Sequence, residues 1–409
     1  MDKKRIIFAV IFALVSIGMG YLLYILFWAP TPEVEDVIPG EVTPGEEFPG
    51  IGDLEGLPTG AEGDIVFPEV DITPEIPGGA GVPGEETPTP VETLVENEII
   101  GVGIGSTGNA NFYNEDDGRF YRIGVNGQIT QLSDETFFNI QNVNWSPTKN
   151  ESIIEYPDGS NIYYNFDTKT QVTLPKHWED FSFSPGGDQI AAKSMGLSPE
   201  NRWLITSDPK GSEVSLIEPL GENANKVIVD WSPNKQIVAM SQTGAPLGDD
   251  RQELLMVGLN GENFKSTVVE GRGLVTQWSP SGSKLLHSVY NTRNDFKPEL
   301  WIVNASGNTI GSGRKVLNVN TWADKCTFAD DRFVYCAVPD ELITGAGFNR
   351  EIADTVRHHM YRIDTESGAR IEVNLGDAFY SINNLYIDES GNKLYFTDTQ
   401  RDGLYGVDI

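Results

Sequence analysis

A short phrase recurs along this chain and constrains its fold more than any other feature. The phrase places an aromatic residue before Ser-Pro, a turn and an apolar strand, as in QWSPSGSKLLHS from residue 277. Its aromatic or apolar position falls, in six aligned copies, at Trp145, Phe183, Trp231, Trp278, Phe328 and Ile387. The copies are roughly 40 to 60 residues apart, close to the period of about 40–50 residues of a β-propeller blade.

Each copy begins a longer unit. A third strand ending in an Asn, Asp or Gly turn follows the phrase, as in NIYYNFDTKT from residue 161, and a short fourth strand comes after it. The unit therefore predicts four antiparallel strands. Proline and glycine in Pro280-Ser281-Gly282 suit the second and fourth positions of a tight turn. We expect the aromatic positions to pack between blades rather than to bind a ligand.

The phrases resemble the WD40-like, PD40-type repeat of the TolB propeller family, whose mark is W-S-P-D-G-x-x-[IL]-A. The resemblance is specific at residues 145–149, 183–192, 231–239 and 278–286, and it covers most of residues 94–409. It implies a β-propeller that is used for binding other proteins. The small α/β domain that precedes the propeller in TolB is replaced here, and the later copies lose Trp and Pro. Partner assignments are therefore not carried over.

The expected fold is all-β, a propeller of seven four-stranded blades, with six or eight blades as the alternatives. Only three strands are available to the last blade, and a sheet left in that state exposes an unpaired edge. The segment PVETLVENE from Pro90 has the pattern of the missing strand. We expect it to pair beside Gly403–Ile409 and close the ring, so that the propeller occupies residues 90–409.

The N-terminus predicts a membrane anchor. Lys3, Lys4 and Arg5 are basic, and residues 6–28 carry no charge. At about 1.5 Å per residue such a helix crosses a hydrocarbon core of about 30 Å. No Lys or Arg follows before Arg119, so the positive-inside rule predicts a cytoplasmic tip at residues 1–5 and an extracytoplasmic propeller. The expected location is the cell membrane, with a cleaved signal peptide as the alternative.

Residues 29–89 predict a disordered stalk between the anchor and the propeller. They are rich in Pro, Gly and acidic residues and contain no basic residue. Such a composition cannot bury enough apolar surface to offset chain entropy. The stalk would lift the propeller away from the membrane; a linker without a role in reach is the alternative.

Charge and cysteine content exclude several classes of protein. The net charge of −31 argues against nucleic-acid binding, because phosphates require clustered Lys and Arg.

Two cysteines, Cys326 and Cys336, fall in one hairpin of the sixth blade. If its turn is centred on Asp331 the two are directly opposite, where a disulfide is feasible. Two buried free thiols are the alternative.

The loops between the second and third strands indicate where the propeller binds. Those of blades three to six are long, and the longest, from Val338 to His358, predicts a short helix with Asn349 as N-cap. Loops on a rigid scaffold carry function, and aromatic and Arg side chains dominate interface energetics. The candidate binding residues are Arg293, Phe296, Phe348 and Arg350. Neutral drift in loop length is the alternative.

No enzyme motif stands out, and no catalytic, cofactor-binding or metal-binding residue is assigned. The chain has no G-x-S-x-G motif. His358 and His359 are neighbours on a strand, so they point to opposite faces. The chain is therefore predicted to be a membrane-anchored module that binds an envelope protein or a glycan. A carbohydrate-active propeller enzyme, a glycosidase or lyase with carboxylates around the channel, is the alternative.

Overall fold

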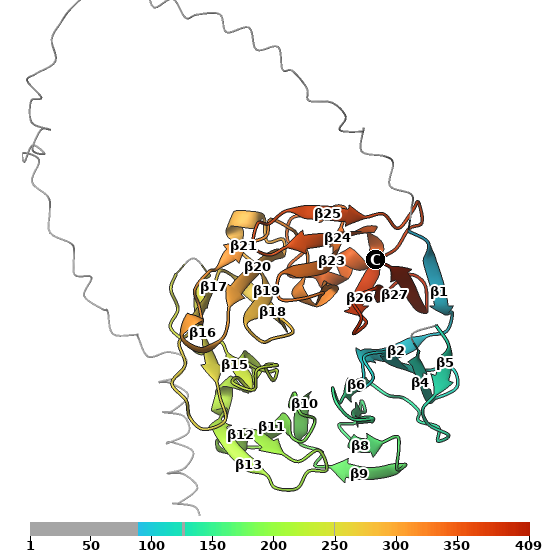
Figure 1. Ribbon diagram of the computed structural model, residues 1–409. Helices are drawn as coiled ribbons and strands as arrows, with labels where there is room; N and C mark the ends of the chain where they lie inside the picture. Colours follow the sequence, from blue (N-terminus) through green and yellow to red (C-terminus); the bar gives the residue numbers. More distant parts are fainter. Residues whose placement is uncertain (1–88, 125–126, 249) are drawn as a thin grey trace, which may run out of the picture. The chain divides into compact units, whose positions relative to one another are not determined.

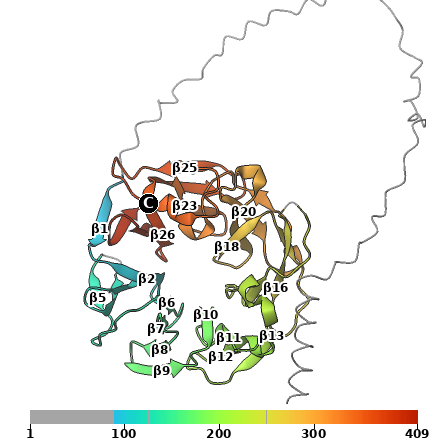
Figure 2. The same ribbon diagram turned by 180° about the vertical axis from the view of Figure 1, so that it is seen from behind.

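The computed structural model describes residues 89–124, 127–248 and 250–409. These form seven four-stranded antiparallel sheets, which follow one another around a central axis as the blades of a β-propeller (Figures 1 and 2). The all-β, seven-bladed prediction is confirmed. The predicted tip, anchor and almost all of the stalk lie outside the described residues. Among those that are described, no helix has the length and apolar character needed to cross a membrane.

In every blade the strands are hydrogen-bonded in chain order from the channel outward, except that the last blade takes its outer strand from the start of the propeller. The strands of blades 1 to 4 are β2 (Ile99–Ile104), β3 (Ala110–Asn114), β4 (Arg119–Ile123), β5 (Ile129–Gln131), β6 (Asn142–Trp145), β7 (Glu151–Glu155), β8 (Asn161–Asn165), β9 (Thr170–Leu174), β10 (Trp178–Phe183), β11 (Ile190–Met195), β12 (Arg202–Ser207), β13 (Ser215–Pro219), β14 (Val227–Val229), β15 (Ala239–Ser241), β16 (Gln252–Val257) and β17 (Thr267–Val269). The strands of blades 5 to 7 are β18 (Arg272–Trp278), β19 (Lys284–Tyr290), β20 (Glu299–Asn304), β21 (Lys315–Val316), β22 (Cys326–Phe328), β23 (Phe333–Pro339), β24 (His358–Asp364), β25 (Arg370–Val373), β26 (Ile382–Ile387), β27 (Lys393–Asp398), β28 (Leu404–Asp408) and β1 (Val91–Val95).

Short 3-10 helices interrupt the connections between strands. They are η1 (Pro199–Asn201), η2 (Gly221–Lys226), η3 (Thr292–Asn294), η4 (Gly307–Thr309), η5 (Ala323–Lys325) and η6 (Arg350–Thr355). The helix predicted in the longest loop is therefore η6. Asn349 is its N-cap residue, but its side chain makes no capping hydrogen bond.

The ring is closed by pairing the two ends of the described chain. Strand β1 lies antiparallel to β28, with Val91 opposite Val407 and Thr93 opposite Tyr405. In Figure 1 this first strand, in blue, lies against the dark red last blade. The side chain of Lys393 adds an ion pair, with Nζ 2.9 Å from Oε2 of Glu92. The predicted closing strand is confirmed.

The six repeat positions lie at or just beyond the end of each inner strand. Trp145, Phe183, Trp278, Phe328 and Ile387 end β6, β10, β18, β22 and β26, and Trp231 follows β14. Two of the indoles join neighbouring blades through hydrogen bonds. Trp278 donates from Nε1 to the carbonyl oxygen of Asp230 at 3.3 Å, and Trp145 donates to Gly101 at 2.7 Å.

Apolar clusters fill the space between adjacent blades. One cluster combines Met240 and Leu254 of blade 4 with Trp278 and Val289 of blade 5. Another joins blade 5 to blade 6 around Phe328. Each blade therefore buries both of its faces against its neighbours, as expected where no blade has a core of its own.

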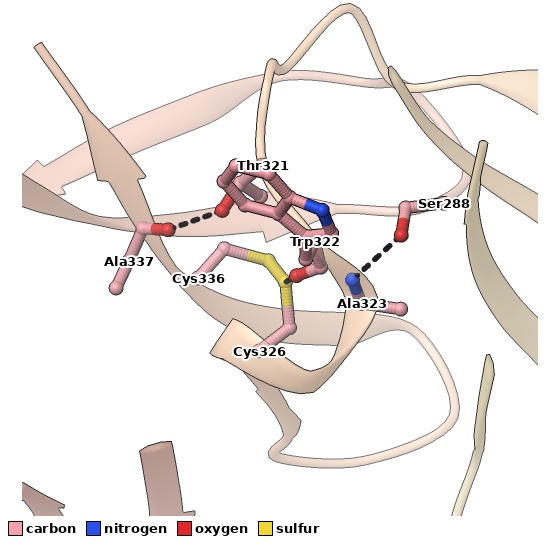
Figure 3. Close-up of a disulfide and its surroundings, with 7 residues drawn as sticks. All are labelled: Ser288, Thr321, Trp322, Ala323, Cys326, Cys336 and Ala337. Carbon is pink, nitrogen blue, oxygen red and sulfur yellow. Dashed lines mark hydrogen bonds between the residues drawn. A yellow bond between two sulfur atoms is a disulfide. The ribbon is translucent and has the colours of Figure 1, made fainter. Parts of the chain in front are cut away.

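The two cysteines form a disulfide in blade 6. Cys326 on β22 lies opposite Cys336 on β23, and their sulfurs are bonded (Figure 3). Hydrogen bonds hold the segment that precedes them. Thr321 donates from Oγ1 to the carbonyl oxygen of Ala337 at 2.6 Å. The amide of Ala323 donates to Oγ of Ser288, in blade 5, at 3.1 Å.

Candidate binding face

One face of the propeller carries the long loops. It is formed by the connections between second and third strands and by the connections between blades, and we call it the loop face. In blades 3 to 6 the former span residues 196–201, 242–251, 291–298 and 340–357. Six of the eleven large exposed hydrophobic residues of the described chain lie on this face: Phe138, Leu197, Leu247, Ile343, Phe348 and Phe379.

The longest loop, residues 340–357, is fixed to blade 5. The amide of Gly345 donates to the carbonyl oxygen of Asp295 at 2.8 Å, and the amide of Gly347 donates to that of Phe296 at 2.7 Å. Asp295 and Phe296 both have positive φ, of 57° and 53°. Non-glycine residues adopt this conformation only where surrounding contacts hold it, and these hydrogen bonds supply such contacts.

The same loop is fixed to blade 7. The carbonyl oxygen of Asp354 accepts hydrogen bonds from Oγ of Ser381 at 2.9 Å, Oγ1 of Thr399 at 3.1 Å and Nε2 of Gln400 at 2.7 Å. The loop therefore extends across three blades. It also has an apolar base, since Leu342, Ala346 and Ala353 pack with Trp322. A long loop held in this way presents its outer side chains on a fixed frame.

Two of the four predicted binding residues are in contact. The centroid of the Phe348 ring lies 5.0 Å from that of Phe296 and 4.7 Å from that of Tyr290. Phe348 remains 59% exposed, although Gly347 beside it approaches Tyr290 so closely that a Cβ there would lie 2.4 Å from the ring. The three aromatic rings form an apolar patch that joins the loops of blades 5 and 6.

The two predicted arginines already have carboxylate partners. Nη1 of Arg350 lies 2.5 Å from Oδ2 of Asp324, and its guanidinium lies over the ring of Trp322. Nη2 of Arg293 lies 3.1 Å from Oε2 of Glu270, a buried carboxylate at the start of blade 5. Both arginines therefore hold their own loops in place. Of the four predicted binding residues, Phe296 and Phe348 are the two that are more available to contact a partner.

A pocket of about 610 Å³ lies on the loop face between blades 5 and 6. Blade 5 and its exit supply Lys297, Asn318 and Asn320, and blade 6 supplies the remaining wall. The lining residues from blade 6 are Val338, Pro339, Asp340, Glu341, Leu342, Ile343, His359, Tyr361 and Arg370. Lys297 and Arg370 have no ion-pair partner among the described residues, and the Arg370 guanidinium lies over the Tyr361 ring.

His359 holds the base of the long loop. Its Nδ1 lies 2.5 Å from Oε1 of Glu372, and its Nε2 lies 2.6 Å from Oδ1 of Asp340. An arrangement in which both ring nitrogens meet carboxylates is satisfied when both nitrogens carry protons. Through these two contacts the His359 ring bridges the first residue of the loop and strand β25. The two carboxylates are occupied by this contact.

The other histidines lie elsewhere. His358 is buried, and burial together with the nearby positive charge of Lys325 lowers its pKa to about 3. His287 is also buried, and its pKa is lowered to about 4, chiefly by desolvation. His177 is exposed. In the part of the chain that the structure describes, no group of three or more His, Cys, Asp or Glu side chains is placed to hold a metal ion.

Sequence reasoning missed the pocket and its His359 bridge. Asp340 and His359 lie at the two ends of the longest loop, and these positions are the sequence feature that could have indicated their contact. Nothing in the spacing indicates that Glu372 joins them, because it reaches the site through the register of β24 with β25, where Tyr361 is opposite Glu372.

A second pocket lies at the channel end formed by the aromatic-Ser-Pro turns. It has a volume of about 510 Å³ and belongs to blades 2, 3 and 4. Its lining consists of Asn144, Trp145, Pro147, Phe181, Ser182, Phe183, Pro185, Val229, Asp230, Trp231 and Pro233. Asp230 is the one charged side chain of this lining.

The chain is similar to several solved propellers. Against an oligogalacturonate lyase in complex with manganese, the TM-score is 0.54 at 14% identity, over 78% of this chain and 93% of that one. An oligogalacturonate lyase from Vibrio parahaemolyticus gives 0.50 at 11% identity, over 80% and 95%. A chain of the mitotic checkpoint complex gives 0.51 at 11% identity, over 79% and 95%. At these identities the likeness shows the fold alone.

No protein-family profile matches the sequence, and no curated protein matches it either.

Proposed function

We propose that this chain is a tethered binding module, whose propeller holds a protein or polymer of the cell envelope on its loop face. The observation that carries the proposal is that six of the eleven large exposed hydrophobic residues of the described chain lie on that face, two of them in its longest loop. Contiguous exposed apolar surface marks interaction sites, and the contacting rings of Tyr290, Phe296 and Phe348 form surface of that kind. The loop that bears Ile343 and Phe348 is fixed to blades 5 and 7 on either side of its own blade, so it would lose little conformational entropy on binding.

The proposed contact area is centred on blades 5 and 6. There the patch of Tyr290, Phe296 and Phe348 supplies apolar area, and the neighbouring pocket supplies Lys297, Arg370 and two asparagine amides. An apolar centre with a polar surround is the usual composition of a protein interface. The same amides and charges suit the hydroxyl and carboxylate groups of a glycan. Nucleic acid is disfavoured by the net charge of −31.

Tethering to the membrane is the second part of the proposal and rests on the sequence. Residues 6–28 have the length and composition of a membrane-spanning helix, with Lys and Arg on one side only. The Cys326–Cys336 disulfide is in keeping with an extracytoplasmic propeller, because disulfides persist in oxidising compartments. The repeated phrase supports a relationship to TolB-type propellers.

A carbohydrate-active enzyme is the weaker candidate. Glycoside hydrolysis commonly uses a pair of carboxylates on either side of the scissile bond. The channel pocket contributes one carboxylate, Asp230. The proposal is therefore binding rather than catalysis.

The test uses residues 80–409, which form one compact unit containing all the described strands. Shortening the loop 340–357 would also remove contacts between blades, so point substitutions give a more specific test of its outer surface. The unit, the variant Ile343→Ser/Phe348→Ser and the control Val214→Ser/Leu216→Ser are compared in capture from an envelope extract. The control residues are also exposed, but lie in blade 3 away from the loop face.

A partner retained by the unit and by the control, and lost by the loop-face variant, is the expected result. Equal capture by all three proteins would remove the loop face from consideration. Thermal unfolding of each variant checks that the fold is kept.

A further inference from the structure

The channel pocket, at the turns of blades 2 to 4, has one charged side chain in its lining, whereas the loop-face pocket has several. Corresponding positions of the repeat, just before the aromatic residue, are Asn144, Ser182, Asp230 and Gln277 in blades 2 to 5. Only blade 4 has a carboxylate there. The repeat itself does not require an acid at this place, since the other blades form the same turn without one.

The carboxylate of Asp230 has no hydrogen-bond or ion-pair partner among the described residues, and the side chain is half-buried in the channel wall. Its backbone is fully used: the amide donates to Val238, and the carbonyl oxygen accepts from the Trp278 indole. The backbone therefore holds the residue in place while its charged group faces the pocket unpaired. A charge in such a position costs free energy unless a partner offsets its desolvation.

The polar neighbours of Asp230 in the pocket are already engaged. Oγ of Ser182 accepts a hydrogen bond from the amide of Trp231 at 2.9 Å. Nδ2 of Asn144 donates to Oε1 of Glu155 at 2.6 Å. Neither side chain supplies a positive charge, and burial without one raises the pKa of Asp230 to about 7.

The remaining wall is aromatic and aliphatic. Trp145, Phe181, Phe183 and Trp231 line the pocket together with three prolines and Val229. Aromatic groups attract cations through the negative potential of their ring faces, and they do so most strongly where water is excluded. A single carboxylate among aromatic groups combines the two features that recognise an organic cation.

We propose that this channel pocket binds an organic ammonium group, with the carboxylate of Asp230 as its counter-charge and the aromatic side chains as its walls. The site lies at the opposite end of the channel from the loop face and does not depend on the function proposed for that face. The ammonium group would belong either to a small free amine or to a lysine side chain of a partner.

The experiment follows the intrinsic tryptophan fluorescence of residues 80–409, since two of the lining residues are tryptophans. Choline and n-butylammonium are the cationic probes, and 3,3-dimethylbutan-1-ol is the uncharged counterpart of choline. The variant Asp230→Asn removes the charge with little change in shape. The variant Glu179→Gln removes an exposed acid of β10 that is outside the pocket lining and serves as the matched control.

The expected result is a saturable change with both ammonium probes, little or none with the alcohol, and binding at least tenfold weaker in Asp230→Asn but not in Glu179→Gln. Equal binding of choline and its alcohol counterpart would overturn the proposal, as would no saturable change at millimolar ammonium. The comparison of probes needs only the unmodified protein, so it decides even where Asp230→Asn fails to fold.

A short Gly-Lys-Gly peptide and its Nε-acetylated form distinguish the two sources. Tighter binding of the free lysine peptide than of n-butylammonium would assign the site to a lysine of a partner. The reverse order would assign it to a small amine.

Discussion

Cys326 and Cys336 are directly opposite on β22 and β23 and are joined through their sulfurs. The hairpin between them is short, so the cross-link restricts a small loop of the unfolded chain. For a loop of this size the expected contribution is about 2–3 kcal/mol. Denaturant unfolding of Cys326→Ala/Cys336→Ala should show a loss of that order. The unmodified protein should show a similar loss when reductant is present, and unfolding that does not change with reductant would contradict the prediction.

Acid should destabilise the propeller through its buried histidines. The folded-state pKa of His287 is about 4, lowered mainly by burial and also by the charge of Arg314. Between pH 6.5 and 4 the unfolded chain therefore binds a proton that the folded chain does not, and stability falls as pH falls. The expected share of His287 is about 3 kcal/mol. Replacing it by Leu should reduce the slope of unfolding free energy against pH, whereas His177→Leu, at an exposed position, should not.

Lys325 should produce a trend of the same sign at alkaline pH. The side chain is fully buried and donates from Nζ to the carbonyl oxygen of Ile382 at 2.6 Å. Desolvation, with a further contribution from Arg350, lowers its pKa to about 8. Between pH 8 and 10 the unfolded lysine is protonated and the folded one is not, so stability rises with pH, by about 2–3 kcal/mol. In Lys325→Met this rise should disappear, and an unchanged rise would contradict the assignment.

Ring closure should depend on residues 91–95. A chain that begins at Ile99 lacks β1 and leaves β28 as an unpaired edge. We expect a lower melting temperature and self-association in size-exclusion chromatography. A peptide of residues 89–98 added in trans should restore both properties, and a scrambled peptide should not. Identical melting of the long and short chains would contradict a closing role for β1.

The sequence predicts the framework well because the blade unit repeats, so that each copy can be compared with the others. The inner-strand position of Trp278 follows from the repeat, and the pairing of β1 with β28 follows from a strand pattern that lacked a partner. Cys326 and Cys336 are placed opposite by counting outward from one turn. Each of these inferences needs only the spacing within a hairpin or between copies of one unit.

The sites are less predictable, because they depend on groups that meet across blades. The aromatic character of Phe296 and Phe348 marks them as candidates, but their contact depends on how the loops of blades 5 and 6 are held against each other. His359 meets Asp340 and Glu372 through strand register, and the abundance of acids conceals such a pair in the sequence. Asp230 stands out once the repeats are aligned, yet its exposure to the channel is known only from the folded ring.

The strand that closes the ring is also the strand through which the propeller continues toward its N-terminus. Tension on the chain before Thr89 reaches the domain through the hydrogen bond from the amide of Thr89 to the carbonyl oxygen of Asn374 and through the hydrogen bonds of β1 to β28. The segment that closes the ring is thus also the segment that first bears mechanical load. If the propeller is held at one end and its partner pulls at the other, the force needed to detach one strand sets an upper limit on what the assembly can withstand.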